Sequence, residues 1–251
     1  MARFAILVVL AVLAFGDQFS LAQETVPQEK QNPDRKNRYE FNPRHDPNGL
    51  GKFYLGREIA HVMTHEGAGW LDRTEREKEE NPKRLLELLK IRPDQVVVDF
   101  GAGSGYYTLR MAALVPKGKA VAVDIQPEML AIIERKKKAE GLENIDLVRN
   151  TEEDPKLPPD SADLILLVDV YHELSLPFEV TRSLAKALKP GGRLVLVEFR
   201  LEDPEVPIKL VHKMSEKQVL RELREIPELE YVETLRELPW QHVIIHRRKA
   251  K

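Results

Sequence analysis

The chain has 251 residues, of which 42% are hydrophobic and 32% are charged, a balance typical of one large or two small folded domains. Its 39 basic and 41 acidic residues leave a formal net charge of -2, which argues against nucleic acid or an anionic membrane as a partner. The sequence contains no cysteine, which excludes disulfides, thiolate metal sites and thiol nucleophiles. The composition therefore favours chemistry on small molecules.

Residues 1–22 have the pattern of a secretory signal peptide. Arg3 precedes the apolar stretch FAILVVLAVLAF, and the small residues Ser20 and Ala22 precede the expected cleavage site. The stretch is shorter than the roughly 20 residues that a spanning helix needs, so we expect cleavage after Ala22 and no stable membrane span afterwards. The protein would then be periplasmic or secreted; a membrane-anchored or cytoplasmic protein is the alternative.

Residues 23–56 are rich in proline, asparagine and charged residues and contain few aliphatic side chains. Such a composition does not supply a core, so the pattern predicts a disordered or extended linker. Residues 57–251 are expected to form one domain with a helical extension at its N-terminal end.

The extension is expected to contain two helical segments. The first is REIAHVM, which has apolar periodicity. His61 and His65 have the spacing of the zinc ligands in a zinc protease motif, but Val62 replaces the catalytic glutamate. We therefore interpret them as ordinary helix histidines. The second is a charged helix that begins at the capping box Thr74-x-x-Glu77 and stops at Pro93.

Beyond Pro93, short apolar runs alternate with segments of helical periodicity. Runs that are apolar throughout predict strands of a parallel sheet covered on both faces. The last two runs, EYVETLREL and HVIIHRR, are joined by a short Pro-Trp turn and predict an antiparallel pair at the sheet edge. The fold class is therefore α/β, doubly wound and mostly parallel. The parallel strands are expected at VVVDF, AVAVDI, NIDLVR, DLILLV and RLVLVEF, and the helices at TLRMAALV, PEMLAIIERKKKA, PFEVTRSLAKAL and SEKQVLRELREI.

The turn after the first parallel strand reads D-x-G-x-G-x-G, beginning at Asp99. Glycines allow backbone amides to approach a ligand closely, but Tyr106 stands where a dinucleotide-binding turn has its third glycine. A carboxylate at Asp99 would repel a pyrophosphate and attract the ammonium of an aminoacyl group. Asp124 ends the next strand, where an acid accepts hydrogen bonds from ribose hydroxyls. The two acids favour a nucleoside cofactor with an aminoacyl end.

Residues 93–200 resemble the class I S-adenosylmethionine-dependent methyltransferases. The resemblance lies in the order and spacing of VVVDFGAGSGYYT, VAVDIQPEML, NIDLVRNTEEDPKLPPDSADLILLVDVYHEL and LAKALKPGGRLVLVEF. It implies a Rossmann-like seven-stranded sheet with a reversed last strand, and S-adenosyl-L-methionine as the cofactor. The cofactor-binding residues that it implies are Asp99, Gly101, Ala102, Gly103, Gly105, Asp124, Ile125, Met129, Thr151, Glu152 and Val168.

Candidates for the methyl-transfer step lie at the ends of the fourth and fifth strands, because ligands bind at the carboxyl ends of such sheets. We assign His172, Tyr171 and His212 as candidate catalytic residues and assign no metal ligands. As a neutral imidazole, His172 could take a proton from the acceptor, or it could shape the substrate wall through hydrogen bonds. His212 could bind an anionic substrate or be solvated.

The favoured hypothesis is an S-adenosylmethionine-dependent methyltransferase that acts on a small molecule. The fourth strand lacks the Asn/Asp-Pro-Pro-aromatic sequence of enzymes that methylate base or amide nitrogens, and no nucleic acid partner is expected. The alternative is a non-catalytic module or sensor that binds S-adenosylmethionine or a related nucleoside. Export raises the question of how a cofactor made in the cytoplasm reaches the protein. The acceptor and the oligomeric state are left open.

Overall fold

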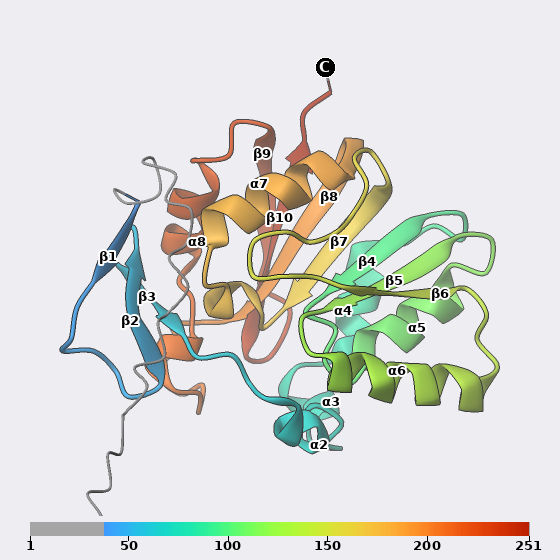
Figure 1. Ribbon diagram of the computed structural model, residues 1–251, viewed down its shortest axis with the longest axis horizontal. Helices are drawn as coiled ribbons and strands as arrows, with labels where there is room; N and C mark the ends of the chain where they lie inside the picture. The colour runs from blue at the N-terminus through green and yellow to red at the C-terminus, as the bar shows by residue number, and fades with distance from the viewer. Residues whose placement is uncertain (1–37, 251) are drawn as a thin grey trace, which may run out of the picture. The chain divides into compact units, whose positions relative to one another are not determined.

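The computed structural model describes residues 38–250 (Figure 1). The signal peptide expected at residues 1–22 lies outside the described residues, as does part of the expected linker. Within residues 38–250, no helix combines the length and the apolar character needed to cross a bilayer.

The larger of two sheets has seven strands in the order β6-β5-β4-β7-β8-β10-β9. Strands β4 to β8 pair in parallel, whereas β10 is antiparallel to both β8 and β9. The predicted mostly parallel sheet with an antiparallel edge pair is therefore confirmed. Its strands are β4 (Val96–Phe100), β5 (Lys119–Asp124), β6 (Ile145–Arg149), β7 (Ala162–Val168), β8 (Leu188–Phe199), β9 (Leu229–Leu235) and β10 (Gln241–Arg248).

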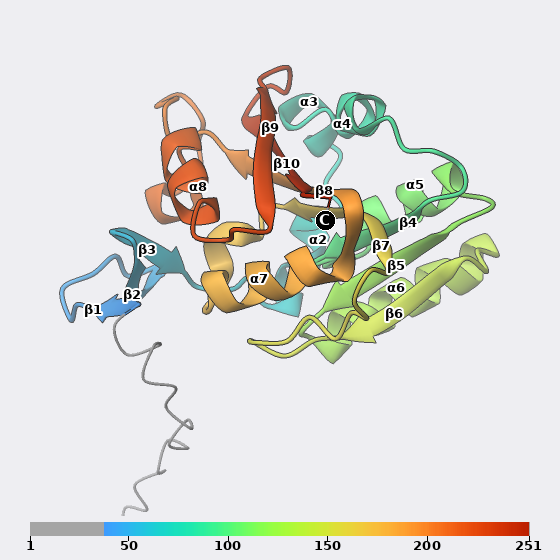
Figure 2. The same ribbon diagram turned by 90° about the horizontal axis from the view of Figure 1, so that it is seen from above.

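Helices cover both faces of this sheet, because successive residues of a strand point to opposite faces and here both sets are apolar. Val97 of β4 packs in the cluster that contains residues of α4, α5 and α6, while Val98 and Phe100 pack in the cluster that contains residues of α7 and α8. Figure 2 shows α4 and α5 on the opposite side of the sheet from α7. The helices are α4 (Pro82–Leu89), α5 (Tyr106–Leu114), α6 (Pro127–Glu140), α7 (Pro177–Ala187) and α8 (Glu216–Leu223).

A second, three-stranded antiparallel sheet contradicts the predicted linker for the part of residues 23–56 that the structure describes. It consists of β1 (Tyr39–Phe41), β2 (Gly49–Tyr54) and β3 (Arg57–Ala60). Tyr39 and Tyr54 are 7% and 1% exposed, and they pack with Ile59 of β3 and with Leu176, which directly precedes α7. The prediction was wrong because it counted aliphatic residues, whereas aromatic rings supply the buried surface here.

The helical segment predicted at REIAHVM is also wrong, because its first four residues form β3. His61 lies in the loop after β3, and His65 begins the short 3-10 helix η1 (His65–Gly67). The histidines are therefore not neighbours on a helix face. A short helix, α2 (Ala68–Leu71), follows.

The charged helix predicted from Thr74 is in fact two helices, α3 (Arg76–Glu79) and α4. Asn81 separates them, since its backbone is left-handed with a φ of 50° and Pro82 follows it. The Asn81 side chain accepts a hydrogen bond from the Arg84 amide and so caps α4. The capping box predicted at Thr74 does not form, because the Thr74 hydroxyl donates to the Glu75 carboxylate.

A buried ion pair joins the small sheet to α8. Arg57 of β3 donates from Nε and Nη2 to the two carboxylate oxygens of Glu222 in α8, at 2.7 and 3.0 Å. The two side chains are 9% and 0% exposed. Arg57 also donates from Nη1 to the carbonyl oxygen of His172 at 3.1 Å. The pair thus positions the backbone of a candidate site residue as well as the sheet.

Replacing Arg57 with Met should destabilise the protein strongly, since Glu222 is left as a buried carboxylate without its cation. We expect the free energy of unfolding to fall by about 3–5 kcal/mol, measured by urea denaturation. The double variant Arg57→Met/Glu222→Met removes both charges and should recover most of this loss. A double variant as unstable as Arg57→Met would show that the unpaired charge is not the cause.

Candidate active site

A cavity of about 920 Å³ lies at the carboxyl ends of the parallel strands. Its wall includes residues that end or directly follow β4, β5, β6, β7 and β8, and residues of the small sheet and of η3 (Leu210–His212). The strand order reverses between β4 and β7, and ligands of doubly wound sheets bind in the crevice at that point. The volume is near the upper end of the roughly 300–1,000 Å³ of small-molecule sites, so the cavity can hold a cofactor and a second small molecule.

Gly101 and Gly103 of the turn after β4 line the cavity as predicted. Both have a positive φ, 73° and 54°, which favours glycine. A Cβ atom on Gly101 would lie 2.5 Å from Cγ2 of Val170, and one on Gly103 would lie 2.6 Å from Cδ1 of Leu71. Larger residues would therefore displace the cavity wall, and at these two positions the backbone itself lines the cavity.

Asp124, at the end of β5, also lines the cavity as predicted. Its Oδ2 atom accepts a hydrogen bond from the Gly103 amide at 2.8 Å, and Oδ1 accepts one from the Gln126 amide at 2.9 Å. Burial raises the pKa of Asp124, while these backbone donors act in the opposite direction. The two donors fix the carboxylate in orientation and leave lone pairs for ligand hydroxyls. Ile125 and Met129 line the same part of the wall.

Asp99, Ala102 and Gly105 are part of the predicted set but do not line the cavity. Asp99 is 3% exposed and accepts a hydrogen bond from the Thr108 hydroxyl at 2.6 Å. Ala102 belongs to the core cluster. A Cβ atom on Gly105 would lie 2.8 Å from Cγ1 of Ile133. These residues support the glycine turn from behind.

Burial raises the pKa of Asp99 to about 6, with the Thr108 hydrogen bond acting in the opposite direction. Since the ordinary pKa is about 3.8, the folded protein holds a proton between about pH 4 and pH 6 that the unfolded chain has lost. The stability contribution of this group is therefore greatest at low pH and is lost as the pH rises through that window.

The variant Asp99→Asn cannot titrate, so it should gain stability relative to the native protein as the pH rises from 4 to 7. The gain should be about 2–3 kcal/mol in the free energy of unfolding, measured by urea denaturation at several pH values. Asp146→Asn, which changes an exposed acid on β6 that pairs with Lys119, is the matched control and should show little such trend. A constant difference between Asp99→Asn and the native protein would mean that Asp99 stays ionised in the folded state.

Sequence analysis did not assign Asp169 and Arg76 to the cofactor site, but both line the cavity. Asp169 directly follows β7 with a φ of 55°, which is a strained conformation for a residue with a side chain. Its Oδ2 atom accepts a hydrogen bond from Gln241 at 2.7 Å, whereas Oδ1 is shielded from solvent and lacks a partner among residues 38–250. Burial, followed by the charges of Glu80 and Glu198, raises the pKa of Asp169 well above its usual range.

Arg76 is 4% exposed and donates to Glu80 at 2.7 Å and to the Leu71 carbonyl at 3.0 Å. Burial opposes its charge, but nearby negative groups, Glu80 first, raise the pKa of Arg76 overall. A cation and a carboxylate oxygen without a partner thus face the same cavity, which suits the carboxylate and the ammonium of an amino acid. Arg76 could not be singled out from the sequence, because it lies in the charged run EREKEE.

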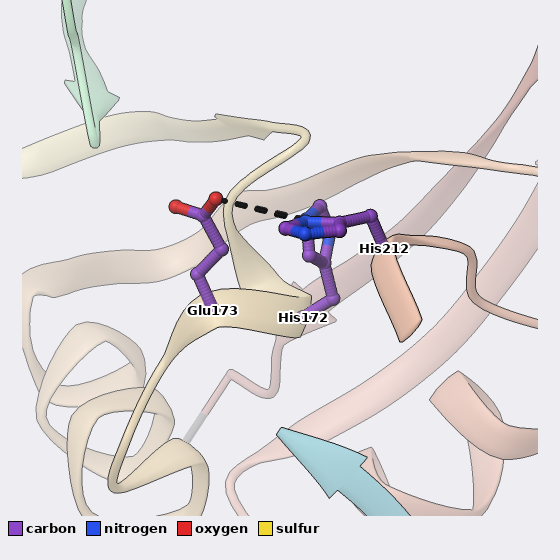
Figure 3. A group of neighbouring side chains, drawn as sticks. All are labelled: His172, Glu173 and His212. Carbon is purple, nitrogen blue, oxygen red and sulfur yellow. Dashed lines mark hydrogen bonds and ion pairs between the residues drawn. The ribbon is translucent and has the colours of Figure 1, made fainter. Parts of the chain in front are cut away.

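A second group of polar residues in the wall consists of His172, Glu173 and His212, called the histidine cluster below (Figure 3). The first two belong to η2 (Tyr171–Glu173) and the third to η3. Nε2 of His172 lies 3.2 Å from Nδ1 of His212. Oε1 of Glu173 lies 4.0 and 3.9 Å from these two nitrogens. Figure 3 shows the carboxylate directed toward both imidazoles.

Glu198, at the end of β8, holds the cluster from behind and is 0% exposed. One of its oxygens lies 2.6 Å from Nδ1 of His172, and the other accepts a hydrogen bond from the Tyr171 amide at 2.9 Å. Burial acts to lower the pKa of His172, but the charge of Glu198 outweighs it and the pKa is raised. The Glu198 contact makes Nδ1 the donor and directs Nε2 toward His212.

The rest of the predicted residues divide between the cavity and its surroundings. Val168 and Glu152 line the cavity, and so does Asn150 in place of the predicted Thr151. Thr151 instead accepts a hydrogen bond from the Asp154 amide. Tyr171 was predicted to be catalytic, but it is 2% exposed and packs in the core cluster between the sheet and α7.

Comparisons with known proteins agree with this geometry. Residues 98–194 match a family profile described as a methyltransferase domain. The chain is 30% identical over 121 residues to the uncharacterized methyltransferase YcgJ of Bacillus subtilis (strain 168), which covers 48% of this chain and 47% of that protein. It is 33% identical over 110 residues to the ubiquinone/menaquinone biosynthesis C-methyltransferase UbiE of Vibrio vulnificus (strain YJ016), covering 43% and 42%.

Among solved structures, a SAM dependent methyltransferase from Aquifex aeolicus matches with a TM-score of 0.70 and 23% identity, covering 74% of this chain and 100% of that one. The fold and the cavity define a doubly wound α/β protein with a site for a nucleoside ligand. The match over residues 98–194 and the shared fold support the resemblance to the class I S-adenosylmethionine-dependent methyltransferases, enzymes whose cofactor is S-adenosyl-L-methionine. It spans about half the length of the curated relatives that it matches.

Proposed function

We propose that the protein transfers a methyl group from S-adenosyl-L-methionine to a small-molecule acceptor. The observation that carries the proposal is that one cavity is lined both by the glycine turn with Asp124 and by the histidine cluster. The first group suits a nucleoside cofactor, and the second offers polar side chains that can orient an acceptor. When bound, the cofactor supplies an electrophilic methyl group on a sulfonium.

The cofactor fits the residues of one side of the cavity. Asp124 would accept hydrogen bonds from the ribose hydroxyls, since its orientation is fixed by two backbone donors. Asp169 would bind the ammonium through its unpartnered Oδ1 atom, and Arg76 would bind the carboxylate. Ile125 and Met129 would pack against the adenine. This assignment moves the ammonium contact from the predicted Asp99 to Asp169.

The acceptor would lie against the histidine cluster and the small sheet. The wall there includes the apolar side chains of Leu50, Val62 and Ile208 beside the polar side chains of Asn48 and Lys209. Nζ of Lys209 donates to Oδ1 of Asn48 at 2.7 Å, which links the loop before β2 to the segment before η3 across the cavity wall. A cavity with this lining suits a small organic acceptor. The name of the matched relative UbiE also denotes methylation in the biosynthesis of small molecules.

The variant Asp124→Ala should bind S-adenosylmethionine at least about tenfold more weakly, because it loses one or two hydrogen bonds to a charged acceptor worth about 1.5–3 kcal/mol each. Isothermal titration calorimetry measures the dissociation constant, and thermal unfolding checks that the variant is folded. Asp146→Ala, which removes an exposed acid on the next strand, should bind as the native protein does. If the native, folded protein does not bind the cofactor at millimolar concentration, the proposal fails.

Methyl transfer is tested with cofactor labelled in the methyl group and a cell extract separated into small molecules and macromolecules. We expect label in the small-molecule fraction, and we expect His172→Ala to reduce its rate by at least about tenfold if His172 orients the acceptor. Cofactor binding without any transfer would favour the sensor alternative. Label that appears only in protein or nucleic acid would contradict a small-molecule acceptor.

A further inference from the structure

We propose that the histidine cluster binds a divalent transition metal ion in the wall of the cavity. Two imidazole nitrogens and one carboxylate oxygen meet there, from His172, His212 and Glu173, and the three atoms lie within 4.8 Å of one another. This set of two histidines and one carboxylate is a common ligand set for zinc and for non-haem iron. The ion site itself does not depend on the proposed function.

The distances match those of ligands that share an ion. The three atoms form a triangle with sides of 3.2, 3.9 and 4.0 Å. The point equidistant from its corners lies about 2.2 Å from each atom, close to the roughly 2.0–2.2 Å of bonds from zinc to imidazole nitrogen and carboxylate oxygen. An ion at that point would need only small side-chain shifts to reach its preferred geometry.

The position of Glu173 suits an ion better than a hydrogen bond to either imidazole. Its side chain is 14% exposed, and its Oε1 atom accepts a hydrogen bond from the Met63 amide at 3.2 Å. The same atom is 3.9 and 4.0 Å from the imidazole nitrogens, which is too long for a hydrogen bond. A carboxylate that faces two nitrogens at this separation has room for a cation between them.

Groups behind the cluster already orient two of the three ligands. Glu198 accepts from Nδ1 of His172, so Nε2 carries its lone pair toward the ion site. A carboxylate behind a metal-binding histidine is the usual arrangement at such sites and raises the basicity of the ligand. The Met63 amide donates to Oε1 of Glu173 and so holds that carboxylate in position. These contacts reduce the entropy that would be lost on binding the ion.

Three protein ligands leave at least one coordination position open, as in catalytic rather than structural zinc sites. The cluster lines the cavity, so the open position would take a water molecule or an oxygen atom of the acceptor. The second of these choices rests on the proposed function. It would select acceptors that carry an oxygen near the methylated atom.

The test uses the untagged full chain after dialysis against a chelator. Titration with Zn²⁺, followed by calorimetry, should show one ion per chain, and Co²⁺ should give the visible absorption of a protein-bound ion. His212→Ala and Glu173→Gln should each weaken Zn²⁺ binding at least about tenfold, and Glu198→Gln should weaken it about 10–100-fold. The matched control is His65→Ala, which removes an exposed histidine of η1 and should leave the affinity unchanged.

A folded protein that binds no Zn²⁺ would overturn the proposal. Equal loss of affinity in His212→Ala and His65→Ala would also overturn it, since the ion would then lie elsewhere. Binding of S-adenosylmethionine to the metal-free protein is measured in parallel. That titration separates the two proposals, because the cofactor residues do not belong to the histidine cluster.

Discussion

The arrangement of the histidine cluster depends on the carboxylate of Glu198. This group is inaccessible to solvent, and a buried charge is tolerated only where its oxygens are bonded. One oxygen bonds the backbone of η2 and the other bonds the ring of His172. Arg57 then bonds the carbonyl of the same histidine and ties it to the small sheet. The position of one imidazole thus follows from charge compensation in the core.

The central sheet and the part of the cavity wall around the glycine turn could be predicted from the sequence because they depend largely on local patterns. Apolar runs between helices specify buried parallel strands, and the turn at Gly101 and Gly103 requires a residue type that few other positions require. Asp124 follows from its place at the end of the next strand, whereas Ile125 and Met129 follow from the resemblance to the methyltransferase family. Neighbouring residues in the sequence determine these features, so they can be predicted before the three-dimensional structure is known.

Other features could not be predicted because they depend on contacts between distant segments. The small sheet is stabilised by two tyrosines packed against Leu176, which no count of aliphatic residues shows. Arg76 looked like part of a solvated helix, and only the tertiary structure places it in the cavity wall. His172 and His212 are 40 residues apart in the sequence and meet because η2 and η3 lie at the same edge of the sheet. The Asn81–Pro82 pair was a local signal for the break between α3 and α4, but the helical periodicity outweighed it.

The unpartnered oxygen of Asp169 bears on the release of product in the proposed reaction. In the proposed binding mode this oxygen faces the ammonium, which the cofactor and its demethylated product both carry. Methyl transfer removes the charge of the sulfonium and leaves the ammonium contact unchanged. The spent cofactor would therefore keep this contact and compete with fresh cofactor for the cavity.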